Sequence, residues 1–197
     1  WSAGQPASVA ATTLLALAPA RRRRVLLLGL GGGSAARVVR ALAPKARIVG
    51  VELDREVVAA ARRWFDLDAL GLEVVVADAQ EYLARERGRF DAVLDDVFIG
   101  PASRVRKPAW LPEPGLRQAA ARVAAGGILA SNAIGEAAAV ARTVGSLYGG
   151  GVGIEVAGYH NRILAGGAVT SAQTPRAAIR ESAVLAPTLP KLRLRTF

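Results

Sequence analysis

The 197-residue sequence predicts an α/β fold in which a mostly parallel, seven-stranded sheet carries helices on both faces and ends in an antiparallel hairpin. Three observations support this prediction. From Val25 onward, short aliphatic runs alternate with amphipathic helical stretches, which is typical of strand–helix–strand units. A glycine-rich turn directly follows the first of these runs. Two β-rich arms then flank a turn within 151–167, and the chain length favours one domain over 1–197.

The predicted strands are short apolar runs, and the first of them are continuous enough for strands buried on both faces. They are Val25–Gly29, Arg47–Glu52, Leu72–Val76, Phe90–Asp95, Ile128–Asn132, Gly153–Tyr159 and Arg162–Leu164. The predicted helices lie at about 34–43, 54–64, 79–87, 114–125 and 135–147. We expect a leading helix within 1–20, and a helix followed by a loosely specified tail within 168–197.

The net charge of +10 comes almost wholly from arginine, because only Lys45, Lys107 and Lys191 are lysines. Such a charge is compatible with nucleic acid or an acidic protein surface as a partner. It is also what an arginine-biased genome produces. We favour this second explanation, because the sequence has no basic stripe with interleaved aromatic residues of the kind that binds single strands. Nucleic acid thus stays open as a partner without being favoured, and a homodimer also stays open.

The chain has no run of about 20 apolar residues, the length that a membrane span requires. It contains no cysteine, which excludes disulfides and thiolate metal sites. We therefore expect a soluble, cytoplasmic protein without a metal site. The chain begins at Trp1 and has no methionine, so we expect it to be a trimmed piece of a longer product.

The segment Gly29-Leu-Gly-Gly-Gly33 joins the first strand to the next helix. Gly29, Gly31 and Gly33 allow a tight turn and let a ligand approach the backbone closely. The amino terminus of the helix adds free N–H groups and a partial positive charge. These properties predict a nucleotide site, although a glycine turn can also be purely structural.

Glu52 ends the second strand about 20 residues after the glycines, where a carboxylate reaches the two ribose hydroxyls of an adenosine. We expect Glu52 to bind the ribose and Asp54 to cap the following helix. A carboxylate at this position argues against NADP, which requires a basic residue there.

The third and fourth strands also end in carboxylates. Asp78 and Ala79 offer a carboxylate and a free N–H that suit the amino group and ring nitrogen of adenine, although Asp78 can alternatively only cap the next helix. Asp95 and Asp96 point to opposite faces, because side chains alternate along a strand. We favour Asp96 for the chemistry, since ligands bind beyond the strand tips in such sheets, and expect Asp95 to bond to backbone or to an arginine.

A long connection, Val97–Pro114, follows the fourth strand and contains Trp110 and the basic residues Arg104, Arg106 and Lys107. Connections of this length in a compact domain are commonly functional. We expect this one to form an acceptor-binding lid, with Arg106 and Trp110 as substrate-binding residues. Trp110 can stack on a planar substrate or pin the lid to the core, and both alternatives stay open.

Together these features make the sequence resemble the spermidine synthase-like branch of the class I S-adenosylmethionine-dependent methyltransferase superfamily, from about Ala18 to Gly167. The motifs that carry the resemblance are Val25-Leu-Leu-Leu-Gly-Leu-Gly-Gly-Gly-Ser34, Val51-Glu-Leu-Asp54, Arg63-Trp-Phe65, Val76-Ala-Asp-Ala79, Asp91-Ala-Val-Leu-Asp-Asp96, Gly126-Gly-Ile-Leu-Ala-Ser-Asn132 and Asn161-Arg-Ile-Leu164. The resemblance implies a Rossmann-like fold. It also implies that the strand-end residues named above hold S-adenosylmethionine or its decarboxylated form.

Two departures from the family pattern bear on the reaction. Aminopropyltransferases of this branch carry an aspartate in the glycine turn that binds the amine of decarboxylated S-adenosylmethionine, where this chain has Gly32. They carry another shortly after the position of Asp96 that binds the polyamine, where this chain has Val97–Pro101. Without these carboxylates, a protein of charge +10 attracts a polycation poorly. We therefore favour a methyltransferase with a small-molecule or protein acceptor over a polyamine aminopropyltransferase (spermidine synthase). A nucleoside-binding module without catalysis is the third hypothesis.

Overall fold

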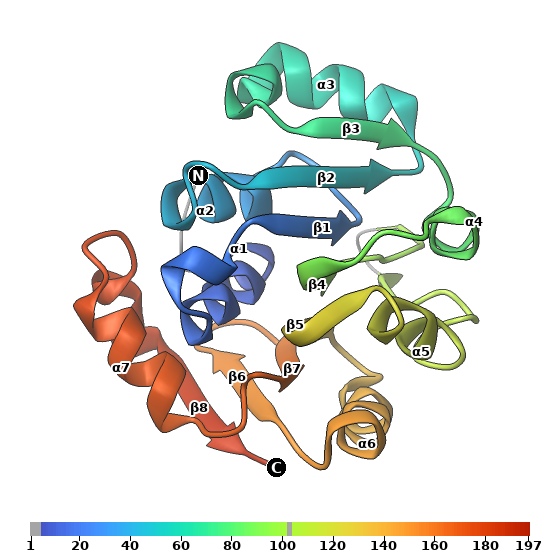
Figure 1. Ribbon diagram of the computed structural model, residues 1–197. Coiled ribbons are helices and arrows are strands. Elements are labelled where there is room, and N and C mark those ends of the chain that lie inside the picture. Colours follow the sequence, from blue (N-terminus) through green and yellow to red (C-terminus); the bar gives the residue numbers. More distant parts are fainter. Residues whose placement is uncertain (1–4, 102–103) are drawn as a thin grey trace.

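A computed structural model describes residues 5–101 and 104–197, and Figure 1 shows one twisted sheet with helices around it. The strands are β1 (Arg24–Leu28), β2 (Arg47–Glu52), β3 (Glu73–Val76), β4 (Phe90–Asp95), β5 (Val123–Ala133), β6 (Val152–Val156), β7 (Arg162–Gly167) and β8 (Leu192–Thr196). Their order across the sheet is β3-β2-β1-β4-β5-β7-β6-β8. Strands β1 to β5 are parallel, and β7 is antiparallel to both β5 and β6. The predicted α/β fold with a closing antiparallel hairpin is confirmed.

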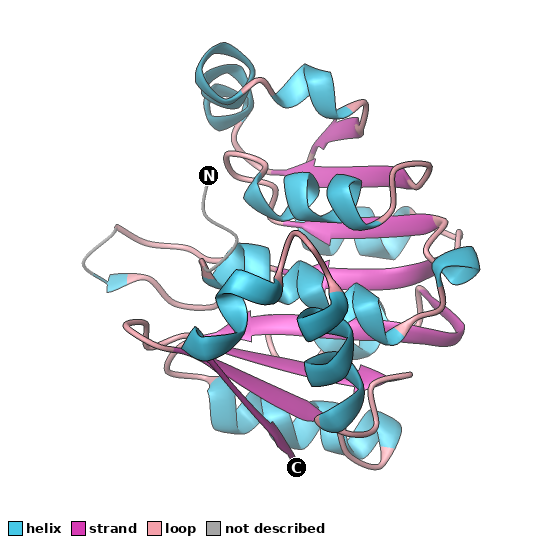
Figure 2. Cartoon of the chain, turned by 90° about the vertical axis from the view of Figure 1, so that its left-hand side faces the viewer, coloured by secondary structure: helices cyan, strands magenta, loops and turns pink. Residues whose placement is uncertain are grey.

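Helices cover both faces of this sheet, as Figure 2 shows from the side. They are α1 (Pro6–Thr12), α2 (Ser34–Leu42), α3 (Arg55–Phe65), α4 (Ala79–Arg85), α5 (Gly115–Ala120), α6 (Ala137–Tyr148) and α7 (Gln173–Glu181). Helices α1, α2, α3 and α7 enclose one half of the core, and α4, α5 and α6 enclose the other. Strand β1 shows why its sequence is continuously apolar: Val25 and Leu27 pack into the first half, while Leu26 and Leu28 pack into the second.

The structure corrects the predicted count of seven strands, because β8 forms within the segment expected to be a loosely specified tail. Leu192 and Leu194 are buried, whereas Arg193 and Arg195 between and after them are exposed. This period of two is the pattern of a strand with one covered face, and it adds β8 antiparallel to β6 at the sheet edge.

The predicted helix over 114–125 is also too long. Helix α5 ends at Ala120, and β5 begins at Val123, where Val123 pairs with Phe90. The register then shifts before Ala92 pairs with Ile128, so the extra residues around Gly126 are accommodated as an irregularity in the ladder.

Helix α1 lies deep in the molecule, within the stretch predicted as a leading helix. Val9, Ala10 and Ala11 are 0 to 1% exposed, and the helix contacts α2, β5 and β7. It is thus part of the core that supports the sheet. No described helix is long and apolar enough to cross a membrane.

Candidate active site

The glycine-rich turn brings the ends of β1 and β4 into direct contact. Gly29, Gly31 and Gly33 all have positive φ angles, of 78°, 52° and 81°, which favour glycine over other residues. A Cβ atom added to Gly29 would lie only 2.5 Å from the carbonyl oxygen of Asp96. Gly33 is the N-cap of α2. The close approach of backbones, as much as the turn itself, therefore requires glycine at residue 29.

Glu52 ties the end of β2 to this turn. Its Oε2 accepts a hydrogen bond from the backbone N–H of Gly31 at 2.9 Å, and its Oε1 accepts one from the N–H of Asp54 at 3.1 Å. The side chain of Asp54 in turn accepts from the N–H of Glu56 at 2.7 Å, which confirms Asp54 as the cap of α3. Because a carboxylate oxygen has more than one lone-pair site, Glu52 keeps capacity for ligand hydroxyls.

Asp78 has the capping role that was the alternative to adenine binding. Its Oδ1 accepts from the N–H groups of Gln80 and Glu81 at 2.7 and 3.1 Å, at the start of α4. The cap uses one carboxyl oxygen, and Asp78 also lines a cleft beside Ala79. Capping and ligand binding are therefore compatible at this residue.

This cleft, of about 340 Å³, lies at the carboxyl ends of β1, β2, β3 and β4. It is lined by seven of the predicted site residues, namely Gly29, Gly31, Glu52, Asp78, Ala79, Asp96 and Trp110. Apolar side chains complete the lining, including Leu53, Val57 and Phe98. Its volume is in the range of small-molecule sites, and its position is where open α/β sheets bind ligands.

Two predicted residues do not line the cleft. Gly33 is buried at the start of α2, and Arg106 is exposed, with its backbone paired to Ile99 by two hydrogen bonds of 2.8 and 3.0 Å. The assignment of Arg106 to the acceptor stays a prediction. Trp110 does line the cleft, and its ring packs so closely on Gly115 that a Cβ there would lie 2.3 Å away. The ring therefore both pins the connection to α5 and faces the site.

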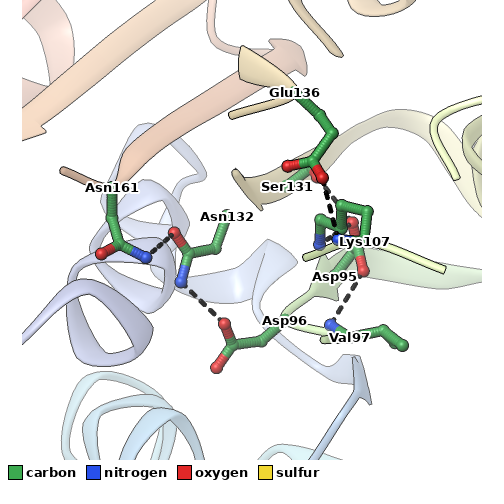
Figure 3. A network of polar contacts seen from close by, with 8 residues as sticks. All are labelled: Asp95, Asp96, Val97, Lys107, Ser131, Asn132, Glu136 and Asn161. Carbon is green, nitrogen blue, oxygen red and sulfur yellow. Dashed lines mark hydrogen bonds and ion pairs between the residues drawn. The ribbon is translucent and has the colours of Figure 1, made fainter. Parts of the chain in front are cut away.

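Asp96 lies on the cleft side of the β4 end, and a chain of two asparagines orients it (Figure 3). Asn132 donates from Nδ2 to Asp96 Oδ1 at 2.7 Å, and Asn161 donates to Asn132 Oδ1 at 3.0 Å. Removal of the carboxyl group from water raises the pKa of Asp96 to about 6, and the negative charge of Asp95 acts in the same direction. The Asn132 hydrogen bond and the charge of Lys107 oppose this increase.

Asp95 points the other way and lies in a buried ion pair (Figure 3). Lys107 Nζ is 2.8 Å from Asp95 Oδ2, and both side chains are 1% exposed. Ser131 Oγ donates to the same carboxyl at 2.5 Å, and the N–H of Val97 donates to its other oxygen at 3.0 Å. The expected backbone bond is thus present, but the cationic partner is a lysine instead of an arginine. This network attaches the connection after β4 to the sheet beneath the cleft.

Sequence reasoning missed the roles of Lys107, Ser131, Asn132 and Asn161. Three of them lie in motifs that carried the family resemblance, and Lys107 lies in the basic segment of the predicted lid. The motifs thus contained these residues, but the sequence does not show which carboxylate each one contacts. Residues that bond to one another here lie up to 36 positions apart in the chain.

A larger hollow, of about 1060 Å³, lies at the opposite edge of the sheet, among Arg22, Arg23, Lys45 and Arg47. It borders the amino ends of β1 and β2, away from the glycine turn, so we assign the chemistry to the smaller cleft. Within residues 5–101 and 104–197, no three histidine or acidic side chains are grouped so that they could hold a metal ion.

The family model described as a methyltransferase domain matches residues 25–125. Polyamine aminopropyltransferase from Chromobacterium violaceum is 41% identical over 80 residues, which cover 40% of this chain and 31% of that protein. The chain spans less than half the length of the curated relatives it matches.

Two solved structures share the fold over nearly the whole chain. Human methyltransferase-like protein 13 in complex with SAH has a TM-score of 0.71 at 22% identity, and covers 93% of this chain and 90% of that one. A probable spermidine synthase from Corynebacterium glutamicum has a TM-score of 0.72 at 21% identity, and covers 96% of this chain and 73% of that one. At these identities the likeness establishes the fold alone.

Proposed function

Because this chain belongs to the methyltransferase domain family, within its spermidine synthase-like branch, we propose that it is an S-adenosylmethionine-dependent methyltransferase. The acceptor is a small molecule or a protein. The observation that carries the proposal is the cleft in which Gly31, Glu52, Asp78 and Asp96 meet, without further carboxylates at Gly32 or within Val97–Ile99.

The cleft fits the nucleoside part of S-adenosylmethionine. Around Gly31 there is open space where a Cβ atom would be, so a ligand can approach the backbone. Glu52 holds the turn in place through the Gly31 N–H and offers its remaining lone pairs to the ribose hydroxyls. The exposed side chains of Leu53 and Val57, 63% and 37% exposed, supply apolar surface beside the base. When bound, S-adenosylmethionine supplies an electrophilic methyl group.

The chain itself orients the acceptor and accepts its proton. Asn161 and Asn132 hold the Asp96 carboxylate in one orientation, so that it can align the acceptor nucleophile and take its proton. A pKa of about 6 leaves Asp96 ionised at neutral pH, yet more basic than an ordinary aspartate. Phe98, Ile99 and Trp110 line the same cleft and give it an apolar wall.

The aminopropyltransferase alternative is supported by the names of the aligned relatives. The surroundings of Gly32 argue against it. A Cβ at Gly32 would lie 3.5 Å from the Phe65 ring, so an apolar side chain borders the position where the resemblance calls for a carboxylate. A nucleoside-binding module without catalysis would bind S-adenosylmethionine but transfer neither a methyl nor an aminopropyl group to any acceptor.

Glu52→Ala is expected to weaken S-adenosylmethionine binding by about 1–3 kcal/mol, because it removes hydrogen bonds to a charged group. Isothermal titration calorimetry measures this difference. Glu52→Gln is the control, since it keeps one acceptor oxygen, and it should bind with intermediate affinity. Unchanged affinity in Glu52→Ala would show that Glu52 does not bind the ribose.

Putrescine and spermidine are expected to receive no aminopropyl group from decarboxylated S-adenosylmethionine. A coupled assay for methylthioadenosine tests this, and clear turnover would reverse the order of the two enzyme hypotheses.

Gly32→Asp is the matched variant, because Gly32 has an ordinary φ angle and room for a Cβ. We expect it to improve binding of decarboxylated S-adenosylmethionine relative to S-adenosylmethionine, since it places a carboxylate near the free amine.

A further inference from the structure

A second groove lies on the same face of the sheet as α6, over the part of β6 and β8 that α6 does not cover. It is bordered by Ala137 and Ala141 of α6 on one side and by Arg193 and Arg195 of β8 on the other, and has a volume of about 310 Å³. At the hairpin end it meets a hollow of about 430 Å³, with which it shares Arg162, Glu155 and Arg193. The two hollows adjoin at these shared residues, and we call them together the β8 groove.

Strand pairing explains why the groove is open and basic. Glu155 pairs with Arg162 on one side and Arg193 on the other, and Gly153 pairs with Leu164 and Arg195 in the same way. Gly153 has no side chain, so the space between α6 and Arg195 stays free. The two β8 arginines must face this side, because Leu192 and Leu194 turn into the core.

The groove has an excess of positive charge. Glu155 is its one acidic lining residue among those described, and it pairs with Arg162 at 3.3 Å. No carboxylate of residues 5–101 or 104–197 forms an ion pair with Lys191, Arg193 or Arg195. Three cations are therefore available to an anionic ligand.

Exposed aromatic rings lie at both ends of the groove. Tyr159, 49% exposed, lines the hairpin end, and Phe197, 40% exposed, lines the other end. The sequence shows no basic stripe with interleaved aromatic residues, but the fold assembles one from the β6–β7 hairpin and β8. Part of the positive charge of the chain thus lies in this groove beside exposed aromatic rings.

We propose that the β8 groove binds single-stranded nucleic acid, with phosphates on Arg193 and Arg195 and a base stacked on Tyr159. Arginines two residues apart on a strand are roughly 7 Å apart, a spacing similar to that of successive phosphates along an extended strand. Guanidinium groups bind phosphate through two parallel hydrogen bonds. A basic channel combined with exposed aromatic rings favours nucleic acid over an acidic peptide, which needs no rings for stacking.

The groove ends next to the candidate active site. The hairpin that carries Tyr159 and Arg162 also carries Asn161, which donates to Asn132 and through it orients Asp96. A bound strand would lie beside the catalytic cleft. The binding proposal does not depend on methyl transfer and is tested without S-adenosylmethionine.

The probe is a fluorescein-labelled, mixed-sequence, single-stranded DNA of about 12 nucleotides, within the range of single-strand site sizes, followed by fluorescence anisotropy at several salt concentrations. Arg193→Gln/Arg195→Gln should weaken binding tenfold or more and reduce the salt slope by about 1.4, as for two lost phosphate contacts. Arg23→Gln/Lys45→Gln removes the same charge from the hollow at the opposite edge and should bind like the wild type. Tyr159→Ala should weaken binding about fivefold or more without changing the slope.

Several outcomes overturn the proposal. The first is that the wild type does not bind the oligonucleotide. The second is that both double variants bind it equally weakly, because binding would then depend only on the overall charge of the protein. Tighter binding of polyglutamate than of the oligonucleotide at equal salt would assign the groove to an acidic protein instead. All substituted side chains are exposed, so the variants are expected to fold, and thermal melts would check this.

Discussion

Asp96→Asn is expected to lower turnover by about 10²–10⁴-fold, the contribution of a general acid or base. The carboxylate lies on the cleft side of the β4 end. The backbone of the same residue packs against the glycine turn, where a Cβ atom added to Gly29 would lie 2.5 Å from the Asp96 carbonyl oxygen. Asparagine keeps the shape and can still accept from Asn132, but it cannot take a proton from the acceptor. Affinity for S-adenosylmethionine should be unchanged, because the ribose and adenine positions are untouched.

The pH dependence of turnover is also expected to follow from Asp96. Because the pKa of Asp96 is raised to about 6, the wild-type rate should rise as pH increases through 6 and level off above 7. The raised pKa also means that ionised Asp96 costs folding stability at neutral pH, a cost that disappears as pH falls below the ordinary aspartate value. Asp96→Asn should therefore be at least as stable as the wild type at pH 7.5. Full activity in this variant would show that the active site is elsewhere.

Lys107→Met is expected to lower the free energy of unfolding by about 3–5 kcal/mol, as when one partner of a buried ion pair is removed. The Asp95 carboxylate would keep the Ser131 hydroxyl and the Val97 N–H, but lose its counter-charge in a site that is 1% exposed. Urea unfolding monitored by circular dichroism measures the change, provided that the slope with urea stays constant.

The matched control for Lys107→Met is Arg47→Gln. It breaks an exposed ion pair with Glu73, at 2.7 Å, and should leave the free energy of unfolding almost unchanged, because water screens the two charges. Asp95→Asn should also lower thermal stability, since it leaves the Lys107 ammonium buried, while folded molecules keep most of their activity. If Lys107→Met and Arg47→Gln prove equally mild, the buried pair does not anchor the connection after β4.

The predictable parts of this fold are those dictated by local pattern. The buried runs of β1 and β2, the glycine turn and the Asp54 cap all follow from a few adjacent residues, and the structure contains them. Strand β8 escaped prediction because its alternation of leucine and arginine is short and follows proline-containing sequence. The boundary between α5 and β5 depends on the pairing of Val123 with Phe90, a contact between distant segments.

The candidate site likewise has residues that the sequence predicts and contacts that it does not. Residues at the strand tips could be placed because parallel strands bring their carboxyl ends to one edge. The opposite orientations of Asp95 and Asp96 follow from strand alternation. The partners of these carboxylates could not be predicted, because Lys107 reaches Asp95 only through the path of the connection after β4. Asn161 reaches Asn132 only through the register of β7 on β5.

The burial of α1 has a consequence for the order of assembly. The helix belongs to the first described residues of the chain, yet it packs against β5 and β7, which lie more than 100 residues later. Helix α2 can cover part of α1 early, but the side of α1 that faces β5 and β7 stays uncovered during synthesis until both strands have emerged from the ribosome. Completion of this part of the core therefore waits for contacts between segments more than 100 residues apart, and until then the exposed apolar face of α1 favours aggregation.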